Sequence, residues 1–567
     1  MDGLQRIAKA YRAAPSDCTV LEQYSQLLER VGLPSAALQA AQQAFLHDGG
    51  NPTRAAAVTL AIAALDRRDE AAAHLLGVVV PLVDAQLQGL RARAGSSENS
   101  TGALERDRHG AVWPVGVIAA RFSEFGWHAE ANKCADELAR LDAALAAEGH
   151  PPSCTALVNC ILGDALVKRG GGGRAGEAQS GEVLSAAIVR FQHAVRATPG
   201  DVRSRAGLAD VLKDQGAFEE ALVQYRAATR LSAGADPVHV FNQAQCLEYV
   251  GEYATAIAEL DAYREAFAEA NDPTQRMQHR CVPLLLTKLL FLSGRHADAE
   301  RVPSLLDETA AYSADQVMEL RRAVPTHWAY VHFIRSLFAN HTPPPLPPRG
   351  IDTCPTLAVV GDSHCLSLAW GNIGLEGVQH VAVPYLVTGL KVWHMRAGLK
   401  FLTNKNLSLV LQNLPQGSPV LFTAGEIDCR EGLLRAVQAG KYASLQEAVS
   451  STVSVFVNAL IALRAEFGHR FYVLPVPPPA KGSSANSTRS AVVALFNAAC
   501  HAALRSSASD QIPSEEAPDG IYLLNYFDRL SVGPAASPTL HQDFEADGIH
   551  LNSSVLPIIE EHLKLCE

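Results

Sequence analysis

The chain has 567 residues, too many for a single hydrophobic core, so we expect a multidomain protein. Its 48% hydrophobic and 19% charged residues are typical of folded protein and exclude a largely disordered chain. The formal net charge of -11 and the lack of a long basic run argue against nucleic acid as a partner.

The sequence favours a cytoplasmic protein. Residues 1–17 contain no apolar core of the kind found in signal peptides. The apolar stretches Ala55–Leu65 and Leu75–Val83 are too short or too interrupted to cross a bilayer, so we expect no membrane span. The 11 cysteines are dispersed, odd in number and without metal-ligand spacing, which indicates buried thiols in a reducing compartment and no metal site.

Two segments of the N-terminal half, Gly207–Ala228 and Ala244–Leu260, repeat with a period of 35 residues. In each, a small residue and a leucine precede a glycine (Gly216 or Gly251), and an alanine follows this glycine five positions later. The spacing predicts a helix, a tight turn and a second helix that packs closely on the first. The pattern resembles the tetratricopeptide repeat (TPR), which implies an all-α, TPR-like solenoid domain over residues 1–340.

Weaker copies of the repeat extend this region. One copy is split by a glycine-rich insertion at residues 170–181, and two others centre on Gly32 and Gly294. Repeat arrays of this kind commonly bind a protein or peptide on their concave face, so we expect such a partner. A packed scaffold without a partner is the alternative, because no cluster of Asn, Lys and Arg marks a binding clamp.

The chain changes character after a proline-rich linker at residues 341–355, which cannot continue a helix because proline lacks the backbone N–H. From residue 356 onward, short apolar runs alternate with helical stretches. Fully apolar strands separated by helices predict a parallel sheet buried on both faces, with chemistry at the carboxyl ends of its strands. The expected strands are 356–360, 378–383, 418–423, 470–475 and 520–524; the expected helices are 367–371, 433–463, 489–505 and one at the end.

Two short motifs in this second region together indicate acyl-transfer chemistry. The first predicted strand runs into Gly361–His364, so Ser363 lies on a strand-to-helix turn where its N–H can meet an oxyanion. A serine there can also act only as a helix cap. Near the other end, Asp547 and His550 are three residues apart before the final helix. Asp547 can orient the imidazole while its other nitrogen faces Ser363, as in a nucleophile–base–acid triad.

The region 356–567 resembles the SGNH/GDSL hydrolase family. The family's first block, Gly-Asp-Ser, matches Gly361–Ser363, and its last block, Asp-x-x-His, matches Asp547 and His550. The resemblance implies a flavodoxin-like, three-layer α/β domain with a parallel sheet. It also implies a serine hydrolase that needs no metal or organic cofactor.

The two middle blocks of the family match less well. The resemblance implies that a glycine N–H in the second block faces the oxyanion, and Gly389 is the best candidate. The third block, Gly-x-Asn-Asp, follows an apolar strand and corresponds to residues 425–428. Ile427 stands in place of the family's asparagine and has no hydrogen-bond donor. Loss of one such donor can cost about two to four kcal/mol of transition-state stabilisation.

Two outcomes follow from this departure. Arg430, steered by Glu426 or Asp428, can replace the missing donor with a charge, which would suit an anionic or sugar-bearing substrate. Alternatively, the site is catalytically dead. We favour a modified active site because the triad residues are retained. His364 beside Ser363 is expected to be an exposed turn residue.

The sequence therefore predicts a cytoplasmic esterase that acts on a small O-acyl ester, such as an O-acetylated carbohydrate. Transfer of the acyl group to a sugar hydroxyl is an alternative to hydrolysis, because both pass through the same acyl-enzyme. The competing hypothesis is a protein-interaction scaffold in which the SGNH-like domain is an inactive module.

Overall fold

The computed structural model of the chain describes the following residues: 17–30, 34–48, 51–86, 177–266, 281–302, 324–340, 355–398, 402–480, 486–506, 520–534 and 538–566, except 66, 84 and 235, with a few others between 115 and 163 and at 318 and 321. Its contacts divide the chain into two compact units. One contains Met1–Leu212 and Val223–Ala233, and the other contains Lys213–Leu222 and Gly234–Glu567.

The described part of the first unit is helical. Small side chains let its helices approach closely: Ala41, Ala55 and Ala61 are almost fully buried where neighbouring helices meet. Farther along, a Cβ at Gly207 would lie 2.3 Å from the ring of Phe191, so this glycine makes room for the phenyl ring. The helices are α2 (Cys18–Arg30), α3 (Pro34–His47), α4 (Pro52–Ala64), α5 (Arg68–His74) with a π-helical turn (Leu75–Val79), α10 (Glu177–Ala197) and α11 (Val202–Asp214).

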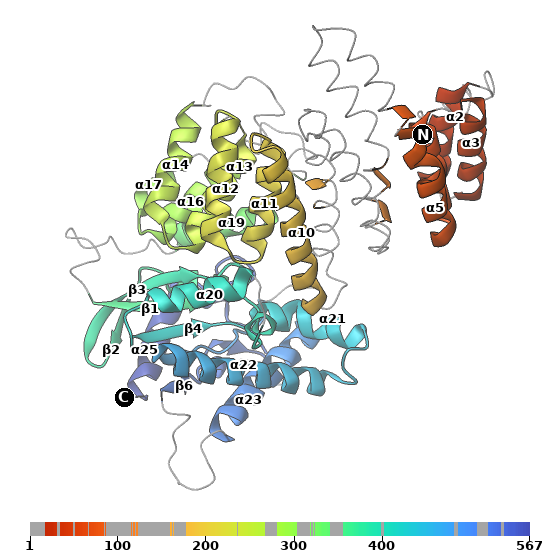
Figure 1. Ribbon diagram of the computed structural model, residues 1–567. Helices are drawn as coiled ribbons and strands as arrows, with labels where there is room; N and C mark the ends of the chain where they lie inside the picture. Colours follow the sequence, from red (N-terminus) through yellow and green to blue (C-terminus); the bar gives the residue numbers. More distant parts are fainter. Residues whose placement is uncertain are drawn as a thin grey trace. The chain divides into compact units, whose positions relative to one another are not determined.

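The repeat predicted from the sequence appears as helix pairs joined by the same turn. Gly216, Gly251 and Gly294 end the first helix of three pairs with φ of 79°, 82° and 74°. After α13, the N–H of Glu252 donates to the carbonyl of Leu247, a Schellman cap that needs this left-handed glycine. The region is therefore TPR-like. Its further helices are α12 (Phe218–Leu231), α13 (Pro237–Tyr249), α14 (Tyr253–Ala266), α16 (Cys281–Leu292), α17 (His296–Arg301) and α19 (Pro325–Asn340) (Figure 1).

The glycine-rich insertion, the copy at Gly32 and the linker can be compared with the structure only in part. Helix α10 begins at Glu177, so the second half of the predicted glycine-rich insertion is helical. The copy centred on Gly32 appears as the helices α2 and α3, although the turn at residues 31–33 between them lies outside the described residues. The first half of the insertion and the proline-rich linker at 341–354 also lie outside them.

The second unit also contains a six-stranded sheet in the order β2-β3-β1-β4-β5-β6. All neighbouring strands are parallel except β2, which runs antiparallel to β3, so the sheet is mixed and the prediction of a purely parallel sheet is wrong. The turn between β2 and β3 consists of Glu376 and Gly377, whose φ of 51° and 72° are those of a tight hairpin turn. The strands are β1 (Thr356–Gly361), β2 (Asn372–Leu375), β3 (Val378–Leu386), β4 (Pro419–Thr423), β5 (Arg470–Val473) and β6 (Ile521–Leu523).

The sheet is buried on both faces, as the apolar strands predict. In β1, Ala358 and Val360 belong to the core formed with α22 and α23, whereas Leu357 and Val359 point the other way and are also fully buried. The helices of this part are α20 (Leu402–Asn413), α21 (Leu433–Gln438), α22 (Leu445–Phe467), α23 (Asn486–Ser506), α24 (Phe527–Leu530) and α25 (Leu556–Lys564); the two-residue strands β7 (Ser531–Val532) and β8 (Thr539–Leu540) pair separately.

Two predicted helices differ in the structure. The segment expected as one helix over 433–463 is broken after α21, because Gly440 adopts a left-handed φ of 71° and Ser444 then caps α22 by accepting the N–H of Glu447. The helix expected at 367–371 is instead a 3-10 helix over Ser363–Leu368. Helix α20 has no counterpart in the prediction.

Helix α22 is long and apolar enough to cross a membrane by length and composition. Its buried side chains, among them Val449, Phe456 and Leu460, pack in the core beside the sheet.

Helices of the TPR-like region pack on the α/β part within the second unit. The indole N–H of Trp370 donates to the carbonyl of Phe291 in α16 at 2.8 Å. The side-chain amide of Asn406 in α20 donates to the carbonyl of Tyr249 in α13 at 3.0 Å. Trp370 and Asn406 are each only 2% exposed, so these are interior contacts. The predicted division of the chain at 340 and 356 stays a prediction.

Candidate active site

Ser363 begins the 3-10 helix that follows β1, at the carboxyl edge of the sheet. The Asp362 carboxylate caps this helix by accepting the N–H of His364 at 3.0 Å, and it also accepts the hydroxyl of Thr423 at 3.2 Å. Gly361 has a φ of 151°, and a Cβ there would lie 2.0 Å from the carbonyl oxygen of Thr423. A close junction between β1 and β4 therefore fixes the backbone that carries Ser363.

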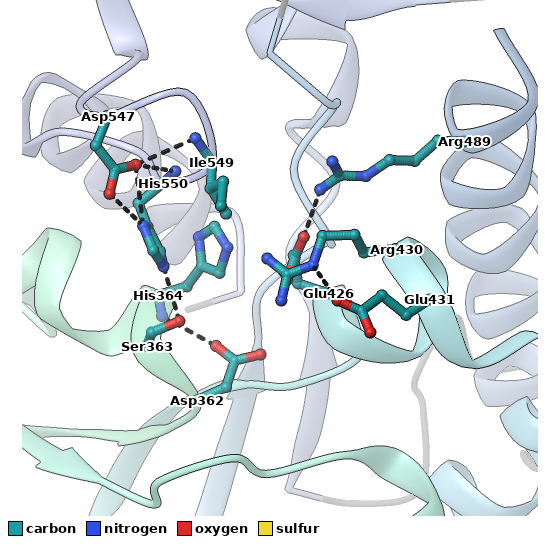
Figure 2. A network of polar contacts seen from close by, with 10 residues as sticks. All are labelled: Asp362, Ser363, His364, Glu426, Arg430, Glu431, Arg489, Asp547, Ile549 and His550. Carbon is teal, nitrogen blue, oxygen red and sulfur yellow. Dashed lines mark hydrogen bonds and ion pairs between the residues drawn. The ribbon is translucent and has the colours of Figure 1, made fainter. Parts of the chain in front are cut away.

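Ser363, His550 and Asp547 form a continuous hydrogen-bonded chain (Figure 2). The Ser363 Oγ lies 2.8 Å from Nε2 of His550, and Nδ1 of His550 lies 2.9 Å and 3.0 Å from the two carboxylate oxygens of Asp547. Because an ionised carboxylate can only accept, Nδ1 carries the proton and Nε2 is left to accept the serine proton.

The segment that carries the acid and the imidazole is a tight turn with a left-handed Gly548 at φ 87°. The N–H groups of Ile549 and His550 both donate to Oδ1 of Asp547, at 3.1 Å and 2.9 Å. Burial raises the pKa of Asp547, but the side-chain hydrogen bond and charge of His550 and the two N–H groups outweigh it and lower this pKa to about 2. The carboxyl group of Asp547 is therefore ionised in the folded protein near neutral pH.

Two further rings surround the imidazole of His550. The ring of Phe333 in α19 is stacked on it, with centroids 4.0 Å apart and planes 16° apart. The ring of His364 lies 4.9 Å away at 48°. His364 is only 6% exposed, so the expectation of an exposed turn residue is wrong. Burial, and then the charge of His550, hold the pKa of His364 well below its usual range, so its ring is neutral.

Gly389 lies in the loop after β3, at the same edge of the sheet as Ser363. The register of the parallel pair places Gly361 opposite Leu386, three residues before Gly389. Gly389 has a left-handed φ of 71°, and a Cβ there would meet no atom within 4 Å, so the backbone borders open space. The buried Asp428 carboxylate accepts the N–H of Val392 at 2.8 Å and so ties down the end of this loop.

The segment after β4 carries a cluster of charges (Figure 2). Glu426 is 4% exposed and pairs with the buried Arg489 of α23 and, at 3.3 Å, with Arg430. Arg430 also approaches Glu431 at 3.5 Å and keeps about a quarter of its side chain exposed. Ile427 is half-buried and brings no donor. Arg430 therefore offers a partly exposed guanidinium. In Figure 2 it points from Glu426 towards Ser363 and His364.

A small cavity of about 20 Å³ lies behind the serine, which is room for about one water. Its lining includes Asp362, His364, Ser367 and Glu426. Among the described residues, neither ring nitrogen of His364 nor the Ser367 hydroxyl has a hydrogen-bond partner. Burial, and then the charge of Glu426, raise the pKa of Asp362 to about 7. The polar wall and the size of the cavity suit a single bound water.

The structure brings together most of the site residues predicted from the sequence, and two neighbours that the sequence did not reveal. Arg489 looks like any basic residue in the first turn of a helix, and only its ion pair with Glu426 marks it as buried. Phe333 belongs to the helical repeats, far from the motif in the chain, so no local signal connects it to His550. In the part of the chain that the structure describes, no group of three His, Cys, Asp or Glu residues is placed to hold a metal ion.

Comparisons with known proteins concern the helical region. No protein-family model matches the chain, and no curated protein matches it. Among solved structures, the TPR2AB-domain:pHSP90 complex of yeast Sti1 matches with 17% identity over 48% of this chain and 98% of that chain (TM-score 0.21). A tetratricopeptide repeat protein from Parabacteroides merdae matches with 16% identity over 54% and 97% (TM-score 0.25). TM-scores this low establish no common overall fold.

Proposed function

We propose that the chain is a serine hydrolase similar to the SGNH/GDSL family, acting on small O-acyl esters such as O-acetylated carbohydrates. The observation that carries the proposal is the hydrogen-bonded chain from Ser363 through His550 to Asp547. The sheet adds support, because its five parallel strands follow the order 2-1-3-4-5 of flavodoxin-like domains, with Ser363 at the carboxyl edge.

The geometry supports the following reaction. His550 Nε2 removes the proton of Ser363 as Oγ attacks the ester carbonyl, and the new C–O bond gives a tetrahedral oxyanion. The imidazolium, stabilised by Asp547, then protonates the leaving alkoxide as the ester C–O bond breaks. Water, activated by the same imidazole, releases the acyl group from Ser363. A sugar hydroxyl in place of this water would make the protein an acyltransferase.

The oxyanion would be held by backbone N–H groups of Ser363 and Gly389. Ser363 begins the 3-10 helix that Asp362 caps, and Gly389 belongs to a loop whose end is held by the hydrogen bond from Val392 to Asp428. Ile427 removes the side-chain donor that the family has at this place. We propose that the guanidinium of Arg430, oriented by Glu426 and Glu431, supplies a donor instead. Such a charged donor favours substrates with acidic or hydroxyl-rich leaving groups.

We further propose that the TPR-like region binds a protein or peptide partner, since stacked helix pairs present long continuous surfaces. A cytoplasmic location is also a proposal. It is supported by buried thiols, those of Cys160, Cys246, Cys281, Cys365, Cys429 and Cys500.

A fluorophosphonate probe tests the proposed activity, because it reacts only with an activated serine. We expect the intact protein to be labelled and Ser363→Ala to lose all labelling. Ser408→Ala is the matched control: this half-buried serine of α20 donates to the carbonyl of Asn404 and has no part in the candidate site, so its variant should label like the wild type. A screen of acetylated sugars and p-nitrophenyl esters then identifies the substrate.

The opposite result would favour the scaffold hypothesis. If the folded wild-type protein is not labelled, the triad is inactive and the missing donor at Ile427 is the physical reason that the structure offers. The TPR-like region would then account for the role of the chain by binding a partner.

A further inference from the structure

The wall behind the imidazole of His550 comes from the TPR-like region. Phe333 is fully buried in α19, and its ring lies almost parallel to that of His550 at 4.0 Å. Stacked rings at this separation are in van der Waals contact over the whole face. One face of the imidazole is therefore covered by a residue outside the α/β part of the chain.

The helix that carries Phe333 is held in place by buried contacts. Helix α19 packs on α16 and on the 3-10 helix that begins with Ser363. Helix α16 is held by the hydrogen bond from Trp370 to the carbonyl of Phe291 and by an ion pair between Lys288 and Glu248 of α13. The ion pair measures 2.7 Å, and its side chains are 1% and 3% exposed. The position of Phe333 is therefore set by packed, rigid elements.

The ring of Phe333 restricts a motion of the imidazole that the hydrogen bonds of the triad still allow. The bond from Nδ1 to Asp547 fixes the direction of one ring nitrogen, but it allows the imidazole to swing about that bond. Such a swing would carry Nε2 away from Ser363. A nearly parallel ring at 4.0 Å blocks it, because a rotation that tilts the imidazole out of its plane would drive one edge into the phenyl face.

We propose that Phe333 is a positioning residue for His550, so that the last helix of the TPR-like region completes the active site. This inference rests on the proposed hydrolase function. It assigns Phe333 no contact with the substrate. It implies that turnover falls when the aromatic ring at position 333 is replaced by a non-planar side chain, even one of similar volume.

The test compares three variants of the full chain by the rate of fluorophosphonate labelling. We expect Phe333→Leu to lower the rate at least about tenfold, because small misplacements of a catalytic base are costly. Phe333→Tyr keeps the ring and should restore most of the rate. Phe338→Leu is the matched control on the same helix, since the Phe338 ring packs on Phe291 and His296 instead. If Phe333→Leu does not fold, Phe333→Met takes its place.

A second readout does not depend on activity. In protein labelled with ¹³C-histidine, the ring current of Phe333 shifts the Cε1–H signal of His550, which is assigned with His550→Gln. Phe333→Leu should remove this shift and broaden the signal as the ring gains freedom, whereas Phe338→Leu should leave it unchanged.

The outcomes separate the two proposals. If the wild type is labelled and Phe333→Leu is labelled at the same rate, the positioning role is wrong and the hydrolase function stands. If the folded wild type is not labelled, the hydrolase function fails and the positioning role fails with it. A slow Phe333→Leu, a rescued Phe333→Tyr and a lost ring-current shift together support the inference.

Discussion

Asp362 shows how burial at a single residue links this site to pH. Its carboxyl is 1% exposed, and burial followed by the charge of Glu426 raises its pKa to about 7. In the unfolded chain an aspartate has a pKa of about 3.9. Between these two values the folded protein binds a proton that the unfolded chain does not, so this residue lowers stability as the pH rises through the window.

Asp362→Asn removes this titration while keeping an oxygen that can accept the N–H of His364 and the hydroxyl of Thr423. We therefore expect the stability of the variant relative to wild type to increase from pH 4 to pH 7 and then to level off. Urea unfolding of both proteins across this range measures the difference. A difference that does not change with pH would contradict the raised pKa.

At the same scale, the sequence predicted the residues that belong to short motifs and missed those that do not. Ser363, Asp547 and His550 could be paired because each lies in a local pattern whose chemistry requires the other. Arg489 and Phe333 reach the site from helices, where an arginine or a phenylalanine has many ordinary explanations. The burial of His364 was also missed, because no periodic pattern surrounds a residue in a turn.

At the scale of elements, Gly361 controls the junction between β1 and β4. Its φ is 151°, and any Cβ at this position would lie 2.0 Å from the Thr423 carbonyl oxygen, which leaves no space for a side chain. Gly361→Ala should lower the free energy of unfolding by about 3 kcal/mol or more, because β1 and β4 must move apart. Thermal unfolding measures the loss.

Gly377→Ala separates backbone strain from lack of space. Gly377 also has a left-handed φ, of 72°, but a Cβ there would meet no atom within 4 Å. We expect a loss of only about 1 kcal/mol, the usual cost of that conformation for an L-residue. Equal losses for the two variants would show that the junction at Gly361 is not crowded.

The strands of the parallel sheet were predictable as elements, because they are apolar runs buried on both faces. Strand β2 was not, since Asn372–Leu375 is only four residues long and contains a polar residue and a glycine at an edge. The break between α21 and α22 was missed because apolar residues continue on either side of Gly440. Only its left-handed φ and the cap at Ser444 reveal it.

At the scale of the whole molecule, composition predicted two regions but not the contacts between them. The change from helical repeats to alternating strands and helices is visible in the sequence. The packing of α13, α16 and α19 on the α/β part depends on Trp370, Asn406 and Phe333, whose partners are far away in the chain. Contacts at such separations leave no periodic signal.

A cut in the chain tests how tightly these parts hold together. The protein is cleaved at a specific protease site inserted within residues 341–355. We expect the two fragments to elute together in size-exclusion chromatography, because interior hydrogen bonds and the stacked rings join them. Separate elution of the fragments would mean that they behave as independent domains.

The stacking of Phe333 on His550 also limits which helical arrays could replace the present one by recombination. A recombination event that joined a different helical array to residues 356–567 would discard one wall beside the imidazole. Exchange of the array would be tolerated only if the incoming helix brought a flat ring to the same place. The two regions are therefore expected to be inherited as one unit, although their sequences look like separable modules.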